Sequence, residues 1–207
     1  MQRVHGVRID DIAAIRKQGF DGTELVKALS FSTFEGGLRH GLFHGDLHAG
    51  NLMVDAKGRI VFLDFGIMGR IDPRDRWLLR ELVYALLVKK DHAAAGRILV
   101  LMGAVGTTKP EPEAAKDLEA FAAPLTLTSL GDMSYADIGR QLSTLADAYD
   151  VKLPRELVLI GKQFLYVERY MKLLAPNWQM MSDPELTGYF ANFMIEVTRE
   201  HQRDVEV

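Results

Sequence analysis

Apolar residues recur at helical spacing along most of this chain. The longest series runs from Leu153 to Leu174 in alternating steps of four and three residues, and Pro176 follows it. Such a stripe is typical of a helix that buries one face, so it predicts a core helix over residues 153–174. Weaker series predict further helices over residues 23–40, 73–90, 93–102, 111–123, 134–149 and 184–201.

Capping residues mark several of the helix ends. Asp72 before Pro73, and Asp183 before Pro184, are typical helix starts, because aspartate caps the helix and proline fits its first turn. Thr23 is expected to cap the helix over residues 23–40.

Short apolar runs predict a few strands. Residues 52–54 and 59–63 flank the run Asp55-Ala56-Lys57-Gly58, which predicts a β-hairpin. Residues 42–43 predict another short strand, and residues 1–12 are expected to be extended up to a turn at Asp10-Asp11. The fold class is therefore expected to be α+β and mostly helical.

Composition limits the function. The 207 residues are 48% hydrophobic and 26% charged, with a formal net charge of −3 and no cysteine. This charge gives no indication of a nucleic-acid partner, and the lack of cysteine excludes a disulfide framework. We find no signal peptide and no run of about 18 apolar residues, so a cytoplasmic location is expected, with peripheral membrane contact left open.

The candidate chemistry lies in two runs on either side of the predicted hairpin. The first is His44-Gly45-Asp46-Leu47-His48-Ala49-Gly50-Asn51, and the second is Leu63-Asp64-Phe65-Gly66. The order H-x-D-x-x-x-x-N and then D-F-G is the one that phosphoryl-transfer enzymes of the protein-kinase type use.

Three polar residues of these runs are the candidate site. Asp46 is the candidate catalytic residue, which accepts the proton of an attacking hydroxyl or orients a water. The hairpin is expected to bring Asn51 and Asp64 together as ligands of Mg²⁺, which needs only a few hard oxygen atoms from the protein. The competing interpretation is that all three are ordinary turn residues, favoured there for backbone reasons.

Neighbouring residues have expected roles as well. His44 is expected to be a scaffold that binds the backbone near D-F-G, with a proton shuttle as the alternative. His48 either contacts a phosphate of a bound nucleotide or packs the loop. Phe65 and Gly66 complete the D-F-G motif as structural residues. The following residues, 67–71, contain no Ser, Thr or Tyr, and no A-P-E segment follows, which disfavours an ordinary protein kinase.

Three segments resemble the UbiB family of atypical kinases, also called ADCK or ABC-one type. They are residues 41–52, residues 63–69, and Leu153-Pro154-Arg155-Glu156-Leu157 with Leu174-Ala175-Pro176. The resemblance implies a protein-kinase-like fold that binds ATP or ADP with Mg²⁺. It also implies an atypical kinase or ATPase that supports isoprenoid quinone (ubiquinone or menaquinone) biosynthesis or lipid homeostasis. In this resemblance Asp46 matches the catalytic aspartate, and Asn51 and Asp64 match the metal-binding residues.

The chain departs from that family at its N-terminal side. No glycine-rich phosphate loop, V-A-I-K-like strand or K-x-G-Q motif precedes the catalytic loop, so the N-terminal lobe is expected to be absent. Residues 1–72 are then the hinge-proximal, catalytic-loop and D-F-G part of a C-terminal lobe, and residues 73–207 are its helical remainder. Because much of the charge that neutralises phosphates comes from the missing lobe, this chain alone is expected to be weakly active or inactive.

Two other functions remain open. A small-molecule phosphotransferase of the aminoglycoside or choline type would need acidic residues facing Asp46 to capture a cationic substrate. An inactive, pseudokinase-like binding domain would fit a missing lobe, but not the retained site residues. The candidate partners are a nucleotide, a prenyl-quinone lipid or membrane surface, and an N-terminal lobe in trans or a second copy of the chain covering exposed apolar surface.

Overall fold

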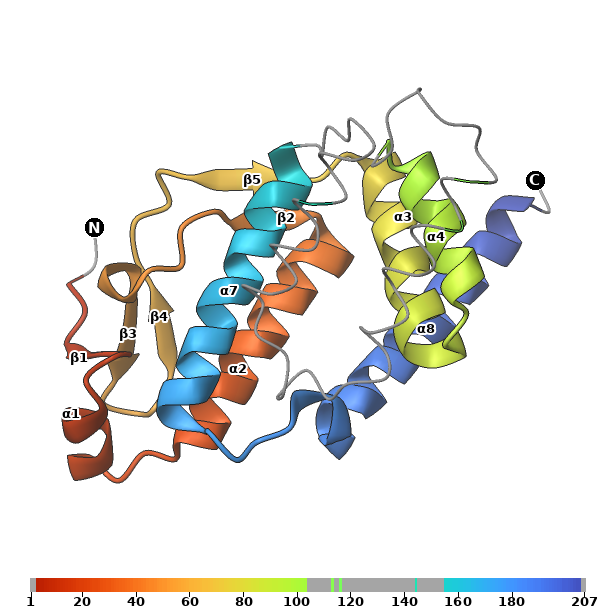
Figure 1. Cartoon of the computed structure of the whole chain (residues 1–207). Coiled ribbons are helices and arrows are strands. Elements are labelled where there is room, and N and C mark those ends of the chain that lie inside the picture. Colours follow the sequence, from red (N-terminus) through yellow and green to blue (C-terminus); the bar gives the residue numbers. More distant parts are fainter. Residues whose placement is uncertain (1–2, 104–112, 114–115, 117–143, 145–154, 206–207) are drawn as a thin grey trace. The chain divides into compact units, whose positions relative to one another are not determined.

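The computed structural model describes residues 3–103, 113, 116, 144 and 155–205 (Figure 1). These residues form mostly helices with two small antiparallel sheets, which confirms the mostly helical α+β prediction. The helices predicted over residues 111–123 and 134–149 lie outside the described residues. Among the helices that the structure describes, none has the length and apolar character needed to cross a bilayer.

The chain divides into two compact units. The first combines Met1–Ile71 with Arg155–Trp178, and the second combines Asp72–Pro154 with Gln179–Val207. The elements of the first unit are β1 (Gly6–Arg8), α1 (Ile12–Lys17), α2 (Gly22–Phe34), η1 (Glu35–His40), β2 (Leu42–His44), η2 (Ala49–Asn51), β3 (Leu52–Asp55), β4 (Ile60–Phe62), β5 (Met68–Arg70) and α7 (Arg155–Leu174). Those of the second unit are α3 (Pro73–Val83), η3 (Tyr84–Lys89), α4 (His92–Leu101), η4 (Met180–Ser182) and α8 (Pro184–Val205). The predicted organisation into residues 1–72 and 73–207 stays a prediction.

Both sheets belong to the first unit. Strands β3 and β4 form the predicted hairpin, with Leu52 opposite Phe62, and β1 adds to the other edge of β3. In the second sheet β2 pairs with β5, so that His44 lies opposite Met68. Sequence periodicity does not predict β5 or α1, because three and six residues are too few for a period to show.

Asp55 organises the turn of the β3–β4 hairpin. Its Oδ1 accepts hydrogen bonds from the backbone N–H groups of Lys57 and Arg59, each at 2.9 Å, and its Oδ2 pairs with the Arg59 guanidinium at 2.7 Å. Hydrogen bonds from the Arg59 backbone and side chain lower the pKa of Asp55 to about 2. The ionised carboxylate therefore stabilises the folded hairpin.

We expect this contribution to depend on pH. Because the folded pKa of Asp55 lies below the unfolded value of about 3.9, acidification protonates the unfolded state first, and the stabilisation is lost as the pH falls from about 4 to about 2. Above pH 4 the parent should be more stable than Asp55→Asn, and the two should converge near pH 2. Urea unfolding at several pH values measures this difference, and a difference that stays constant with pH would contradict the assignment.

Helix α2 packs against α7 in the first unit (Figure 1). Asp21, and not Thr23 as predicted, caps α2, because the Asp21 carboxylate accepts the Thr23 N–H at 2.7 Å. The two helices approach so closely that a Cβ on Gly22 would collide with the carbonyl group of Leu174. The helix predicted over residues 23–40 is present, but its last six residues form the wider π-type turns of η1.

The second unit confirms the predicted helix starts. The Asp72 carboxylate accepts the Arg74 N–H at 2.9 Å at the start of α3, and Asp183 accepts two backbone N–H groups at the start of α8. Helix α8 runs to Val205, beyond the predicted end at residue 201. The ring of Phe193 stacks on Tyr189 with 6.1 Å between centroids and carries the Arg80 guanidinium on its face.

Candidate functional site: the His44–Asn51 loop and the Asp64 segment

The candidate site is built on the loop between β2 and β3 and on the segment after β4. His44, at the end of β2, is buried, and both its ring nitrogens bind backbone. Nδ1 accepts the Asp46 N–H at 3.2 Å, so the proton is on Nε2, which donates to the carbonyl oxygen of Leu63 at 2.9 Å. His44 thus ties the start of the loop to the residue before Asp64. This geometry favours the scaffold role over the proton shuttle.

The Asp46 carboxylate lies between two basic side chains. Lys162 of α7 places its Nζ 3.3 Å from Oδ1, and His48 places its Nε2 3.5 Å from Oδ2. The Nδ1 atom of His48 accepts the Gly50 N–H at 3.0 Å, so the proton of a neutral His48 ring is on Nε2 and faces Asp46. His48 therefore both packs the loop and borders the space around Asp46.

Asn51 closes the loop from its other end. Its Nδ2 donates to the backbone oxygen of Asp46 at 2.9 Å, and its backbone oxygen accepts the Leu63 N–H at 2.8 Å. Within the described part of the chain, Oδ1 of Asn51 receives no hydrogen bond. A side chain that is buried and hydrogen-bonded on its nitrogen side thus keeps its oxygen available as a ligand.

Asp64 follows Leu63 in a left-handed conformation, with φ 52°. Left-handed backbone is uncommon for residues other than glycine but tolerated by aspartate, whose side chain can bond locally. Here Oδ1 accepts the Gly66 N–H at 3.0 Å, and the side chain remains exposed. Because Leu63 is bonded to both His44 and Asn51, the structure places Asp64 next to both ends of the loop.

The structure brings some of the predicted site residues into direct contact and links others only through the backbone. Hydrogen bonds or close charge contacts join Asp46 with His48 and Asn51, whereas Asp64 is linked to them through the backbone of Leu63. Phe65 is 61% exposed, and its ring lies 5.6 Å from that of His44. Gly66 donates to Asp64, as a structural residue of the motif would.

The donor set fits Mg²⁺. An amide oxygen on Asn51 and a carboxylate on Asp64 are the hard oxygen ligands that Mg²⁺ takes, usually one or two per site, with water and phosphate completing the shell. In the described residues, no group of three or more histidine and acidic side chains could hold a metal ion. Asn51 and Asp64 could therefore hold Mg²⁺ only with water or phosphate oxygens as the remaining ligands.

Helix α7 contributes two residues that sequence reasoning missed. Lys162 reaches Asp46 across 116 positions of sequence, and the Tyr170 hydroxyl donates to the backbone oxygen of Leu47 at 2.8 Å across 123 positions. Tyr170 is fully buried, and this burial raises the pKa of its hydroxyl. No local sequence pattern marks either residue as part of the site. The apolar stripe of α7 predicts a buried helix, and it does not indicate which other residues of that helix contact the loop.

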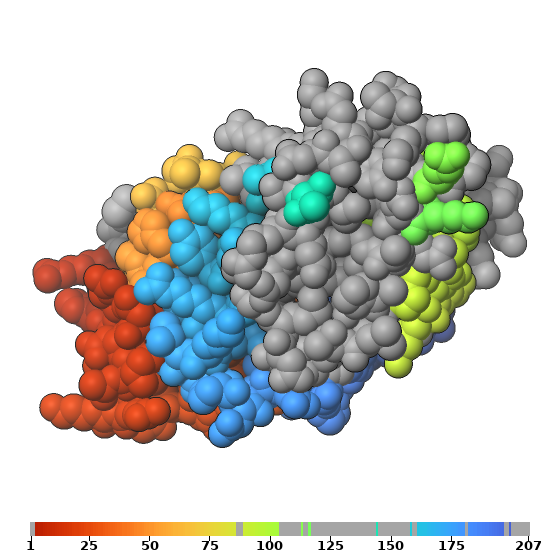
Figure 2. Space-filling model, viewed as in Figure 1, coloured from red at the N-terminus to blue at the C-terminus, as the bar shows by residue number. Residues whose placement is uncertain are grey.

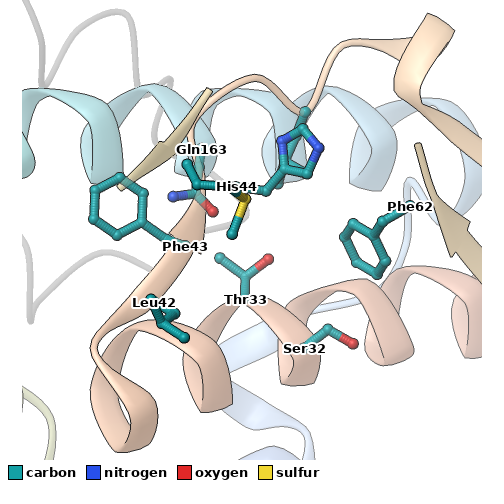
Figure 3. A pocket seen from close by; sticks show the side chains of 9 residues that line it. Ser32, Thr33, Leu42, Phe43, His44, Phe62 and Gln163 are labelled. Atoms are coloured by element: carbon teal, nitrogen blue, oxygen red, sulfur yellow. The ribbon is translucent and has the colours of Figure 1, made fainter. Parts of the chain in front are cut away.

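A cavity of about 150 Å³ lies beside His44 (Figure 3). Its walls come from α2, α7, the strands β2, β4 and β5, and the loop residue Leu47. The lining residues are Ser32, Thr33, Leu42, Phe43, His44, Leu47, Phe62, Met68 and Gln163.

Comparison with known protein families identifies two matching segments. The model of the ABC1 atypical kinase-like domain matches residues 1–99, and that of the UbiB helical domain matches residues 118–179. The first match contains the His44–Asn51 loop and Asp64, and the second contains α7. The chain therefore belongs to the UbiB-type, ABC1 atypical kinase-like family, as the sequence resemblance predicted.

Curated relatives support this assignment. Two proteins of Mycobacterium tuberculosis strains, named only as uncharacterized proteins, are 86% identical over the whole chain, which spans 42% of their length. An Arabidopsis thaliana chloroplastic protein, named as an uncharacterized aarF domain-containing protein kinase, is 34% identical over 90% of the chain and 39% of its own length. The probable protein kinase UbiB of Xanthomonas campestris is 28% identical over 86% of the chain and 33% of its own length. No solved structure matches the chain.

Proposed function

We propose that this chain binds ATP or ADP with Mg²⁺ and carries the catalytic loop of an atypical kinase or ATPase. The observation that carries the proposal is the hydrogen-bonded unit in which His44 and Asn51 both hold Leu63, directly before Asp64. The bond between Asn51 and Leu63 continues the β3–β4 ladder, whereas the bond from the buried His44 side chain is an additional one that neither a hairpin nor a turn requires. Because the chain spans less than half the length of these relatives, the activity of a whole protein is part of the proposal.

In this proposal Asp46 is the proton acceptor. The oxygen of an acceptor hydroxyl or of water forms a bond to the γ-phosphorus of ATP, and the bond from that phosphorus to the bridging oxygen breaks. The electron pair leaves with ADP, and the proton of the acceptor passes to the Asp46 carboxylate. Asn51 and Asp64 would hold Mg²⁺, which supplies charge neutralisation on the phosphates when bound.

The wider biological role is proposed from the family resemblance, which does not name the acceptor. We propose a role in isoprenoid quinone (ubiquinone or menaquinone) biosynthesis or lipid homeostasis, with a prenyl-quinone lipid or a membrane surface as partner. The alternative function is a small-molecule phosphotransferase, and the contacts of Asp46 weigh against it. The two side chains beside the Asp46 carboxylate, His48 and Lys162, are both basic. A basic surrounding disfavours the cationic substrates of aminoglycoside- or choline-type phosphotransferases. An N-terminal lobe in trans, self-association, a cytoplasmic location and weak activity of the chain by itself stay predictions.

Thermal unfolding with and without Mg-ATP tests the nucleotide site. At about a hundred times its dissociation constant, Mg-ATP should stabilise the parent by roughly 2.7 kcal/mol. The stabilisation should require Mg²⁺ and vanish in Asp64→Asn, which removes the charged ligand but keeps the shape of the side chain. Turnover assays with lipid and small-molecule acceptors then follow.

A parent protein that shows no shift would contradict nucleotide binding by this chain. A shift of equal size in Asp64→Asn would contradict the role of Asp64 as a metal ligand.

A further inference from the structure

One face of α7 contacts the catalytic loop at two points. Lys162, Tyr166 and Tyr170 are four residues apart and share a face of the helix. Lys162 contacts the Asp46 carboxylate, and Tyr170 donates to the backbone oxygen of Leu47. Helix α7, which is part of the segment that matches the UbiB helical domain, therefore lies against the catalytic loop of the kinase-like domain. Figure 2 shows the outer side of α7 beside the N-terminal elements.

The pair between Lys162 and Asp46 contributes little to stability. The lysine side chain is 45% exposed and the aspartate side chain 23% exposed, and such exposed ion pairs are typically worth about 0–1 kcal/mol. The Lys162 ammonium also lies 5.8 Å from the centre of the Tyr166 ring, on the same face of the helix. Lysine carries its charge on a flexible four-carbon stem. Lys162 is therefore held near Asp46 but remains free to reorient.

The chemistry of Asp46 defines what else must come near Lys162. A general base lies about 2.6–3.2 Å from the acceptor oxygen, and that oxygen lies about 3–3.5 Å from the phosphorus it attacks. The transferred phosphoryl group must therefore enter the space beside the Asp46 carboxylate, where the Lys162 ammonium is 3.3 Å away. The charge of this group is what catalysis of phosphoryl transfer has to neutralise.

We propose that Lys162 of α7 binds the terminal phosphate of a nucleoside triphosphate at this site. The inference rests on the proposed nucleotide function and adds to it. Without nucleotide Lys162 pairs with Asp46; with nucleotide it turns to the γ-phosphate and frees the carboxylate to accept a proton. The helical-domain segment thereby supplies a positive charge to the site, and the catalytic loop itself contributes His48 at the same carboxylate.

The test compares the affinities of the full chain for Mg-ATP and Mg-ADP in three variants. Lys162→Met should weaken Mg-ATP binding by about 10- to 100-fold, the value of a hydrogen bond to a charged group. It should leave Mg-ADP binding nearly unchanged, because ADP lacks the terminal phosphate. Lys162→Arg should retain most of the preference for ATP.

Lys172→Met is the matched control on the same helix. Lys172 is 59% exposed and pairs with Glu168 at 2.6 Å, and it lies about 15 Å further along the helix axis. This variant should bind both nucleotides as the parent does. If Lys162→Met lowers the affinities for Mg-ATP and Mg-ADP equally, or lowers neither, Lys162 does not bind the terminal phosphate. The proposed nucleotide function would still stand in that case. A parent that binds neither nucleotide would overturn the proposed function, and this inference with it.

Discussion

Replacing Asp46 by asparagine is expected to slow phosphate transfer from ATP by about 10²–10⁴-fold, the usual contribution of a positioned general base. Asparagine keeps the size of the side chain but cannot accept the proton of the attacking oxygen. Affinity for Mg-ATP should change much less, because Asn51 and Asp64, not Asp46, are the proposed metal ligands. The measurement is the rate of phosphate release from ATP by the parent and by Asp46→Asn, made with proteins of the same length. The ratio of the two rates tests the prediction.

Asp21→Asn provides the control for this substitution. Asp21 caps α2 in the same unit, and asparagine caps a helix about as well as aspartate. Its turnover should equal that of the parent. A rate for Asp46→Asn that matches the rate of this control would show that Asp46 is not the base and would return it to the class of turn residues.

The second large effect is expected at Tyr170. Tyr170→Phe should lower the free energy of unfolding by about 1–3 kcal/mol, because the backbone oxygen of Leu47 loses its donor in a buried place. Tyr170→Ala should cost about 3–5 kcal/mol, since it also leaves a cavity where a fully buried ring stood. Urea unfolding followed by circular dichroism measures both, and the phenylalanine variant remains informative if the alanine variant does not fold.

Tyr166→Phe is the matched control for the hydroxyl. Tyr166 lies one turn before Tyr170 on α7, and its hydroxyl makes no hydrogen bond to the residues that the structure describes. Removing that hydroxyl should change stability by less than about 0.5 kcal/mol, as for most surface changes. Equal losses in the two phenylalanine variants would show that the bond to Leu47 does not hold α7 against the loop.

Sequence reasoning worked best where the relevant neighbours are close along the chain. The hairpin of β3 and β4 follows from its turn residues, and the starts of α3 and α8 follow from Asp72-Pro73 and Asp183-Pro184. The correction at the start of α2 is of the same local kind. Asp21 and Thr23 are both capping residue types, and only the observed backbone shows that the Asp21 carboxylate accepts the Thr23 N–H.

The sequence by itself determined the family, the loop that holds Asp46 and Asn51, and the core stripe of α7. These depend on residue types at fixed short spacings, which set local hydrogen bonds and the buried face of each helix. Tertiary structure alone decided that α7 returns to the first unit, where Lys162 meets Asp46 and Tyr170 meets Leu47. The apolar burial that brings such distant segments together has no direction of its own. A local sequence pattern therefore does not predict which polar residues are brought side by side when the apolar faces are buried.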